Sequence, residues 1–78
     1  MYVIEYKTPI SKYVVSSVIY DENNKINLIN SFCFTDGYIL CKYFKNKEEC
    51  NAVVNFLQNY VINHCTDIDI DSIQIKEA

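Results

Sequence analysis

The sequence predicts an α+β fold, with one amphipathic helix packed on one face of an antiparallel four- to five-stranded sheet in the order β-β-β-β-α-β. Two observations predict it. Apolar residues recur at helical spacing over residues 46–65, and apolar and polar residues alternate in the segments on either side. The 78 residues have room for one hydrophobic core, so we expect residues 1–78 to form a single domain.

The predicted helix has a start signal and one apolar face. Asn46 can accept a backbone N–H group of the first turn, and Glu49 follows it at the spacing of a capping box. We expect an apolar stripe along the helix to be buried against the sheet. The stripe consists of Cys50, Val53, Val54, Leu57, Val61, His64 and Cys65, with Phe56 and Tyr60 along its edge.

Four segments before the helix are predicted strands because they alternate or are rich in β-branched and aromatic residues. They are residues 2–7, 12–20, 26–35 and 38–44. In the first, the apolar side chains Tyr2, Ile4 and Tyr6 alternate with Val3, Glu5 and Lys7, as in a strand with one face inward. The pair Asp36-Gly37 predicts a tight hairpin between the third and fourth strands.

A last strand is predicted after the helix, where Ile68 and Ile70 alternate with aspartates. The alternation breaks at Ser72, and a bulge at Asp71-Ser72 would return all four isoleucines of this segment to one side. The strand can pair antiparallel with the first strand or parallel with the fourth. We favour the first arrangement.

Apolar residues on both faces of the second and fourth strands predict a second contact surface. The second strand has Tyr13, Val15 and Ile19 on one face and Val14, Val18 and Tyr20 on the other. Since one helix covers only one face, we expect a protein partner, or a second copy in a homodimer, to cover the other. The candidate contact residues in the sheet are Tyr13, Tyr20, Tyr38, Leu40 and Phe44. Ordinary strand propensity explains the strand tyrosines equally well.

The charge of the chain is localised. Residues 1–65 hold equal numbers of acidic and basic side chains, so the net charge of −3 comes from the residues after them. Asp67, Asp69 and Asp71 are expected on one strand face, where they either contact a basic partner or keep an edge strand soluble. The chain has no arginine, which argues against direct binding of nucleic acid.

No pattern in the chain predicts an enzyme, a cofactor or a metal site. The cysteines at 33, 41, 50 and 65 lack the close pairs typical of zinc sites, so we expect reduced, structural thiols. His64 and Cys65 are adjacent on the helix and point about 100° apart, which separates a base from a nucleophile. The start of the chain has no signal-peptide pattern and no apolar run is long enough for a membrane span, so we expect a cytoplasmic protein.

Two stretches around the helix start resemble small phage and prophage proteins of low-GC bacteria. They are Phe34-Thr35-Asp36 and Tyr43-Phe44-Lys45-Asn46-Lys47-Glu48-Glu49. Some proteins of this kind are anti-CRISPR or other anti-defence inhibitors. The resemblance implies a non-enzymatic protein-binding module that inhibits a host defence component, such as a CRISPR effector nuclease. The alternative is a homodimeric domain that binds a small molecule in a tyrosine-lined pocket.

Overall fold

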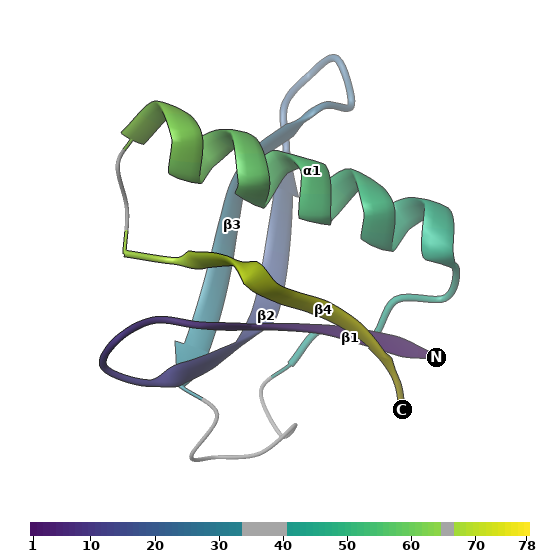
Figure 1. Ribbon diagram of the computed structural model, residues 1–78. Helices are drawn as coiled ribbons and strands as arrows, with labels where there is room; N and C mark the ends of the chain where they lie inside the picture. Colours follow the sequence, from purple (N-terminus) through teal and green to yellow (C-terminus); the bar gives the residue numbers. More distant parts are fainter. Residues whose placement is uncertain (34–40, 65–66) are drawn as a thin grey trace.

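An antiparallel four-stranded sheet with one helix across it makes up the described part of the chain, residues 1–33, 41–64 and 67–78 in a computed structural model (Figure 1). The elements are β1 (Tyr2–Lys7), β2 (Lys12–Tyr20), β3 (Ile26–Cys33), α1 (Lys47–His64) and β4 (Asp69–Glu77). The strand order is β3-β2-β1-β4. This confirms the predicted fold class and the antiparallel pairing of the last strand with the first.

The two halves of the sheet run in different directions. β1 and β2 pair only near their connecting turn, from Glu5 opposite Val14 to Lys7 opposite Lys12. From Glu5 toward the start of β1, and from Val14 toward the end of β2, the two strands diverge. β1 and β4 then run along the helix, while β2 and β3 cross beneath it (Figure 1). The sheet is therefore strongly coiled around the underside of α1.

Residues 41–44 fill the fork between the diverging strands, and this differs from the predicted strand at 38–44. Tyr2 and Phe44 exchange two backbone hydrogen bonds of 2.8 Å, and the N–H of Lys42 donates to the carbonyl of Val15 at 2.8 Å. The described part of the predicted strand thus pairs with β1 and β2 and not beside β3. The divergence of β1 from β2 leaves these backbone groups without ladder partners, and residues 41–44 supply them. The predicted Asp36-Gly37 hairpin lies outside the described residues.

The core lies between α1 and the sheet. From the predicted helix stripe, Cys50, Val53 and Leu57 are buried and Val54 packs beside them, which confirms this part of the stripe. The side chains of Val61, His64 and Cys65 lie outside the described residues. The sheet contributes four buried side chains, Ile4, Tyr6, Val15 and Phe44.

Two irregularities decide which side chains reach this core. In β2, Val15 pairs with Ser31 and Ser17 with Asn30, so Ser16 is an extra residue and the alternation reverses after it. In β4, the register shifts between Asp69 and Gln74, as predicted near Asp71-Ser72. Ile68, Ile73 and Ile75 consequently pack against the core, whereas Ile70 is half-buried outside this cluster. The prediction that the bulge brings all four isoleucines together is therefore wrong for Ile70.

We predict that the Asn46 cap is a measurable part of helix stability. Its Oδ1 accepts the backbone N–H of Glu49 at 2.8 Å, so Asn46→Ala should lower the free energy of unfolding by about 1 kcal/mol. Urea denaturation measures this. The matched control is Asn55→Ala at an exposed position inside the helix, which should be neutral or slightly stabilising because alanine has the higher helix propensity. Equal losses in both variants would contradict a capping role.

Candidate protein-binding surface

Three large apolar side chains of β2 and β3 lie exposed on the sheet face that α1 does not cover. Ile19 is 45%, Leu28 46% and Phe32 48% exposed. Ile19 pairs directly with Leu28, and Phe32 pairs with the buried Val14. Directly paired residues share a face, and Val18 and Ile29, which precede Ile19 and follow Leu28, pack against the core. Ile19 and Leu28 therefore lie on the far side of the sheet from the helix, and Phe32, at period two from Leu28, lies on that face as well. We call Ile19, Leu28 and Phe32 the open apolar surface.

The bulge at Ser16 creates this surface. Without it, Val18 would point away from the helix and Ile19 toward it, as the uninterrupted alternation predicts. With it, Val18 packs against the core and Ile19 turns outward opposite Leu28. A polar pair lies on the same face, where the amide nitrogen of Asn30 donates to the hydroxyl of Ser17 at 3.0 Å.

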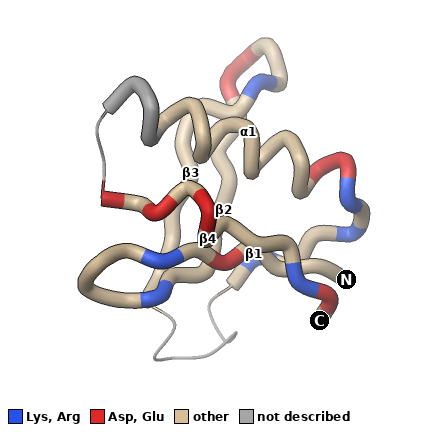
Figure 2. The backbone as a smooth tube through the Cα atoms, in the orientation of Figure 1, with Lys and Arg blue, Asp and Glu red and all other residues tan. Residues whose placement is uncertain are grey.

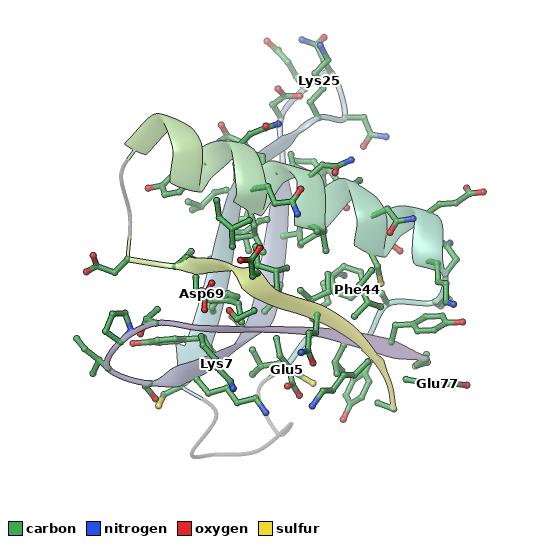
Figure 3. The ribbon with its side chains drawn as sticks, in the orientation of Figure 1. Glu5, Lys7, Lys25, Phe44, Asp69 and Glu77 are labelled. Atoms are coloured by element: carbon green, nitrogen blue, oxygen red, sulfur yellow. The ribbon has the colours of Figure 1, made fainter. Side chains whose placement is uncertain are left out.

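On the same sheet face, the half formed by β1 and the start of β2 is buried. Val3, Glu5 and Val14 are each at most 1% exposed, although the alternation of the first strand predicts Glu5 on a solvent face. That expectation is wrong because both neighbouring strands place lysines over the carboxylate. Its Oε1 lies 2.9 Å from Nζ of Lys12 on β2 and 3.2 Å from Nζ of Lys76 on β4 (Figure 3 labels Glu5).

Glu5, Lys12 and Lys76, which we call the Glu5 cluster, line a cleft of about 210 Å³ together with residues that include Lys7, Ser72 and Gln74. Its two ion pairs are unequally screened, since the side chains of Lys12 and Lys76 are 33% and 43% exposed while that of Glu5 is 2% exposed. The two ammonium groups compensate the charge of the buried Glu5 carboxylate. We therefore assign the cluster a structural role, because it joins β1 to both neighbouring strands.

The predicted contact residues in the sheet differ from one another in burial and surroundings. Phe44 is 1% exposed and packs in the core beneath α1, so its predicted role in partner binding is wrong (Figure 3). Tyr13 is half-buried, and its ring stacks on Tyr6 at 5.7 Å between centroids. Tyr20 is 40% exposed at the end of β2. Tyr38 and Leu40 lie outside the described residues.

Sequence reasoning missed Leu28 and Phe32. A signal was present, since Leu28, Asn30 and Phe32 recur at period two in the third strand. The bulge in the second strand, which turns Ile19 to the same face, has no comparable mark because Ser16 and Ser17 are ordinary strand-compatible residues.

Acidic positions follow one another closely along the backbone near the start of β4 (Figure 2). The side chains of the three aspartates there are all exposed. Asp67 precedes the strand, and Asp69 and Asp71 belong to its irregular first part, where Oδ1 of Asp69 accepts the N–H of Asp71 at 3.1 Å. The hydroxyl of Ser72 donates to the carbonyl of Asp69 at 2.6 Å and accepts the N–H of Lys7 at 2.7 Å. Asp69 and Asp71 thus take part in the bulge while their charges remain available to solvent.

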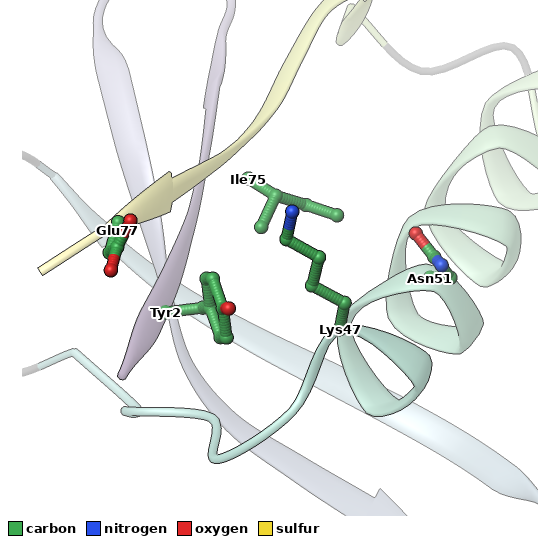
Figure 4. Close-up of a pocket in the computed structure, with 5 residues that line it drawn as sticks. All are labelled: Tyr2, Lys47, Asn51, Ile75 and Glu77. Atoms are coloured by element: carbon green, nitrogen blue, oxygen red, sulfur yellow. The ribbon is translucent and has the colours of Figure 1, made fainter.

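An open groove of about 410 Å³ lies between the start of α1, the start of β1 and the end of β4 (Figure 4). Its lining residues are Tyr2, Lys47, Asn51, Ile75 and Glu77. The ammonium of Lys47 lies 5.8 Å from the centre of the Tyr2 ring. Ligand pockets are mostly apolar and enclosed, whereas this groove is open and has one tyrosine and one isoleucine beside three polar or charged residues, so it does not match the predicted tyrosine-lined pocket.

The described thiols have structural surroundings. Cys50 is fully buried in the core, and this burial, with the nearby Glu49 carboxylate, raises the pKa of its thiol, which keeps it neutral and unreactive. Cys33 and Cys41 are half-buried thiols outside any disulfide, and Sγ of Cys33 lies 2.8 Å from the hydroxyl of Ser11. Among the described residues, no three His, Cys, Asp or Glu side chains are grouped closely enough to hold a metal ion.

Comparisons with known proteins add no assignment. No family model matches the chain, and neither a curated protein nor a solved structure is significantly similar to it. In the described part of the chain, no helix combines the length and apolar character needed to cross a membrane.

We predict that the two lysines together, and not surface charge in general, keep Glu5 in the sheet. Lys12→Met with Lys76→Met should lower the free energy of unfolding by about 3 kcal/mol, because a buried carboxylate loses both partners. Lys25→Met with Lys45→Met removes the same charge at exposed positions and should change stability by about 0.5 kcal/mol or less. Urea denaturation of the two double variants compares them. Similar losses in both would show that Glu5 does not depend on its two neighbours.

Proposed function

We propose that the chain is a non-catalytic protein-binding domain whose contact surface is the open apolar surface. The observation that carries this proposal is the exposure of Ile19, Leu28 and Phe32 by 45–48% on a sheet face that no other described element covers. Apolar side chains exposed together on one face, here Ile19 beside Leu28 and Phe32 beyond the Ser17–Asn30 pair, mark interaction sites on soluble proteins. Phe32 is the aromatic member of the three and is the side chain from which we expect the largest contribution.

The size of this surface sets what it contributes to binding. Burying the exposed halves of three such side chains stabilises a complex by roughly 3 kcal/mol. A micromolar Kd corresponds to about 8 kcal/mol, so polar and backbone contacts around the three side chains must supply the rest. The Ser17–Asn30 pair lies on the same face and offers hydrogen-bonding groups to a partner.

We propose further that the partner is a nucleic-acid-handling host defence protein, such as a CRISPR effector nuclease, in the cytoplasm of a bacterium. The resemblance to small phage proteins supports this class of partner, and the exposed carboxylates of Asp67, Asp69 and Asp71 support it independently. Proteins that bind nucleic acid present basic channels. A localised acidic cluster is attracted to such a channel and speeds association more than it strengthens the final complex.

The test is loss of partner binding on substitution of the open apolar surface. Immobilised chain captures partners from a bacterial lysate, the captured protein is purified, and its Kd is measured against wild type and variants. Leu28→Ser with Phe32→Ser should weaken binding by about tenfold or more, since roughly 2 kcal/mol of apolar burial is removed. Ile10→Ser, at an 88% exposed position in the β1–β2 turn, is the control and should bind as wild type does.

The acidic residues are tested in the same measurement. Replacing Asp67, Asp69 and Asp71 together by Asn should slow association at low ionic strength, and the difference should disappear at high salt because exposed charges are screened. Unchanged binding by the Leu28/Phe32 variant would refute the open apolar surface as the contact. An unchanged association rate of the aspartate variant would refute the basic channel as the target while leaving the apolar contact intact.

A further inference from the structure

The two edge strands of the described sheet differ in how well they are protected from pairing with another chain. β4 carries Asp69, Asp71, Lys76 and Glu77 and is irregular between Asp69 and Gln74. Charges and bulges of this kind prevent edge-to-edge association. β3 (Ile26–Cys33) is eight residues long and has no charged residue and no proline. Its outer edge has no partner strand among the described residues. β3 therefore has the composition of a strand that pairs.

The exposed apolar residues of β3 are placed symmetrically about Asn30, so two copies of the strand can pair with these residues opposite each other. If a second copy pairs antiparallel with β3 and Asn30 lies opposite Asn30, then Leu28 lies opposite Phe32 of the second copy. Directly opposite residues share a face, so two side chains that are 46% and 48% exposed in one copy would cover each other twice. A shift of two residues in either direction places Asn30 opposite Leu28 or Phe32 and loses this match.

The helix side of β3 fits the same register. A groove of about 160 Å³ lies between β3 and α1, and Leu28 stands at its rim. Its lining residues are Tyr6, Asn27, Leu28, Ile29, Phe56, Leu57, Tyr60 and Ile68. With Asn30 at the two-fold axis, the residues of the second copy opposite Ile29 and Asn27 are its Ser31 and Cys33. Both are small side chains, which suits a narrow groove. An uncharged strand also brings no like charges together, although each chain carries a net charge of −3.

We propose that two copies of the chain pair antiparallel through β3, with the two-fold axis at Asn30, to form one continuous sheet β4-β1-β2-β3-β3-β2-β1-β4. This goes beyond the proposed function and does not depend on it. In the dimer the open apolar surfaces of the two copies adjoin on one side of the sheet. Pairing through one strand gives a small interface, so the dimer forms with a Kd of about 10 µM to 1 mM.

The first test compares one added charge at two neighbouring positions. Asn30→Lys and Ser17→Lys each remove the Asn30–Ser17 hydrogen bond and add a positive charge to the same face, but only position 30 lies on the two-fold axis. Sedimentation equilibrium over about 10 µM to 1 mM should show a dimer for wild type and Ser17→Lys. Asn30→Lys should dissociate about tenfold or more readily, because like charges lie directly opposite. A monomeric wild type, or equal dissociation of both variants, overturns the proposal.

The second test fixes the register and serves also if Asn30→Lys fails to fold. Directly opposite residues of an antiparallel pair have Cα atoms about 4.5–5.5 Å apart, which is within disulfide range. Mild oxidation of Asn30→Cys should link two chains through the introduced thiols, identified by peptide mass mapping. Wild type and Ser17→Cys should give no such dimer. A link from position 30 to Cys33, or no excess over wild type, contradicts pairing centred on Asn30.

Discussion

The rest of the structure depends on β1, which is buried on both faces. Ile4 and Tyr6 pack under α1, while Val3 and Glu5 face the other side and are equally inaccessible. A carboxylate in such a strand is stable only with compensating cations. Lys12 and Lys76 supply them from the strands on either side. Their ion pairs with one oxygen join all three strands and favour the registers observed between them.

Because β1 is buried on both faces, the large apolar side chains most exposed to solvent in this sheet lie in β2 and β3. Beyond Glu5, β1 and β2 diverge, and residues 41–44 complete the backbone pairing of the fork. After the bulge at Ser16, β2 gives Val18 to the core and Ile19 to the open face. The open apolar surface and the uncharged edge strand therefore belong to the same half of the molecule, and the charged, irregular edge belongs to the other.

Local patterns predicted most of the fold because they depend on residues close in sequence. The Asn46 cap, the Cys50–Leu57 stripe and the break near Ser72 follow from spacing alone, and the structure has all three. Phe44 was misplaced because its position depends on how far β1 and β2 diverge, which is a property of sheet coiling. Glu5 was misplaced because two lysines distant in sequence compensate it.

The open apolar surface was only partly predictable for the same reason. Exposed apolar residues on a second sheet face were expected, but the particular residues follow from the bulge at Ser16. A bulge in a strand without glycine or proline leaves no compositional signal, since its cause is the pairing with β3. The acidic residues near the start of β4, by contrast, are exposed as their alternation with isoleucine predicts.

Residue-resolved amide hydrogen exchange, measured at low and high protein concentration and again with bound partner, tests most directly whether the β2–β3 half is the interacting half. The account predicts that the outward amides within residues 28–32 exchange more slowly as concentration rises or partner is added. The amides of residues 74–77 at the opposite edge should exchange at an unchanged rate. Protection confined to β4, or no change in either strand under any of these conditions, would contradict it.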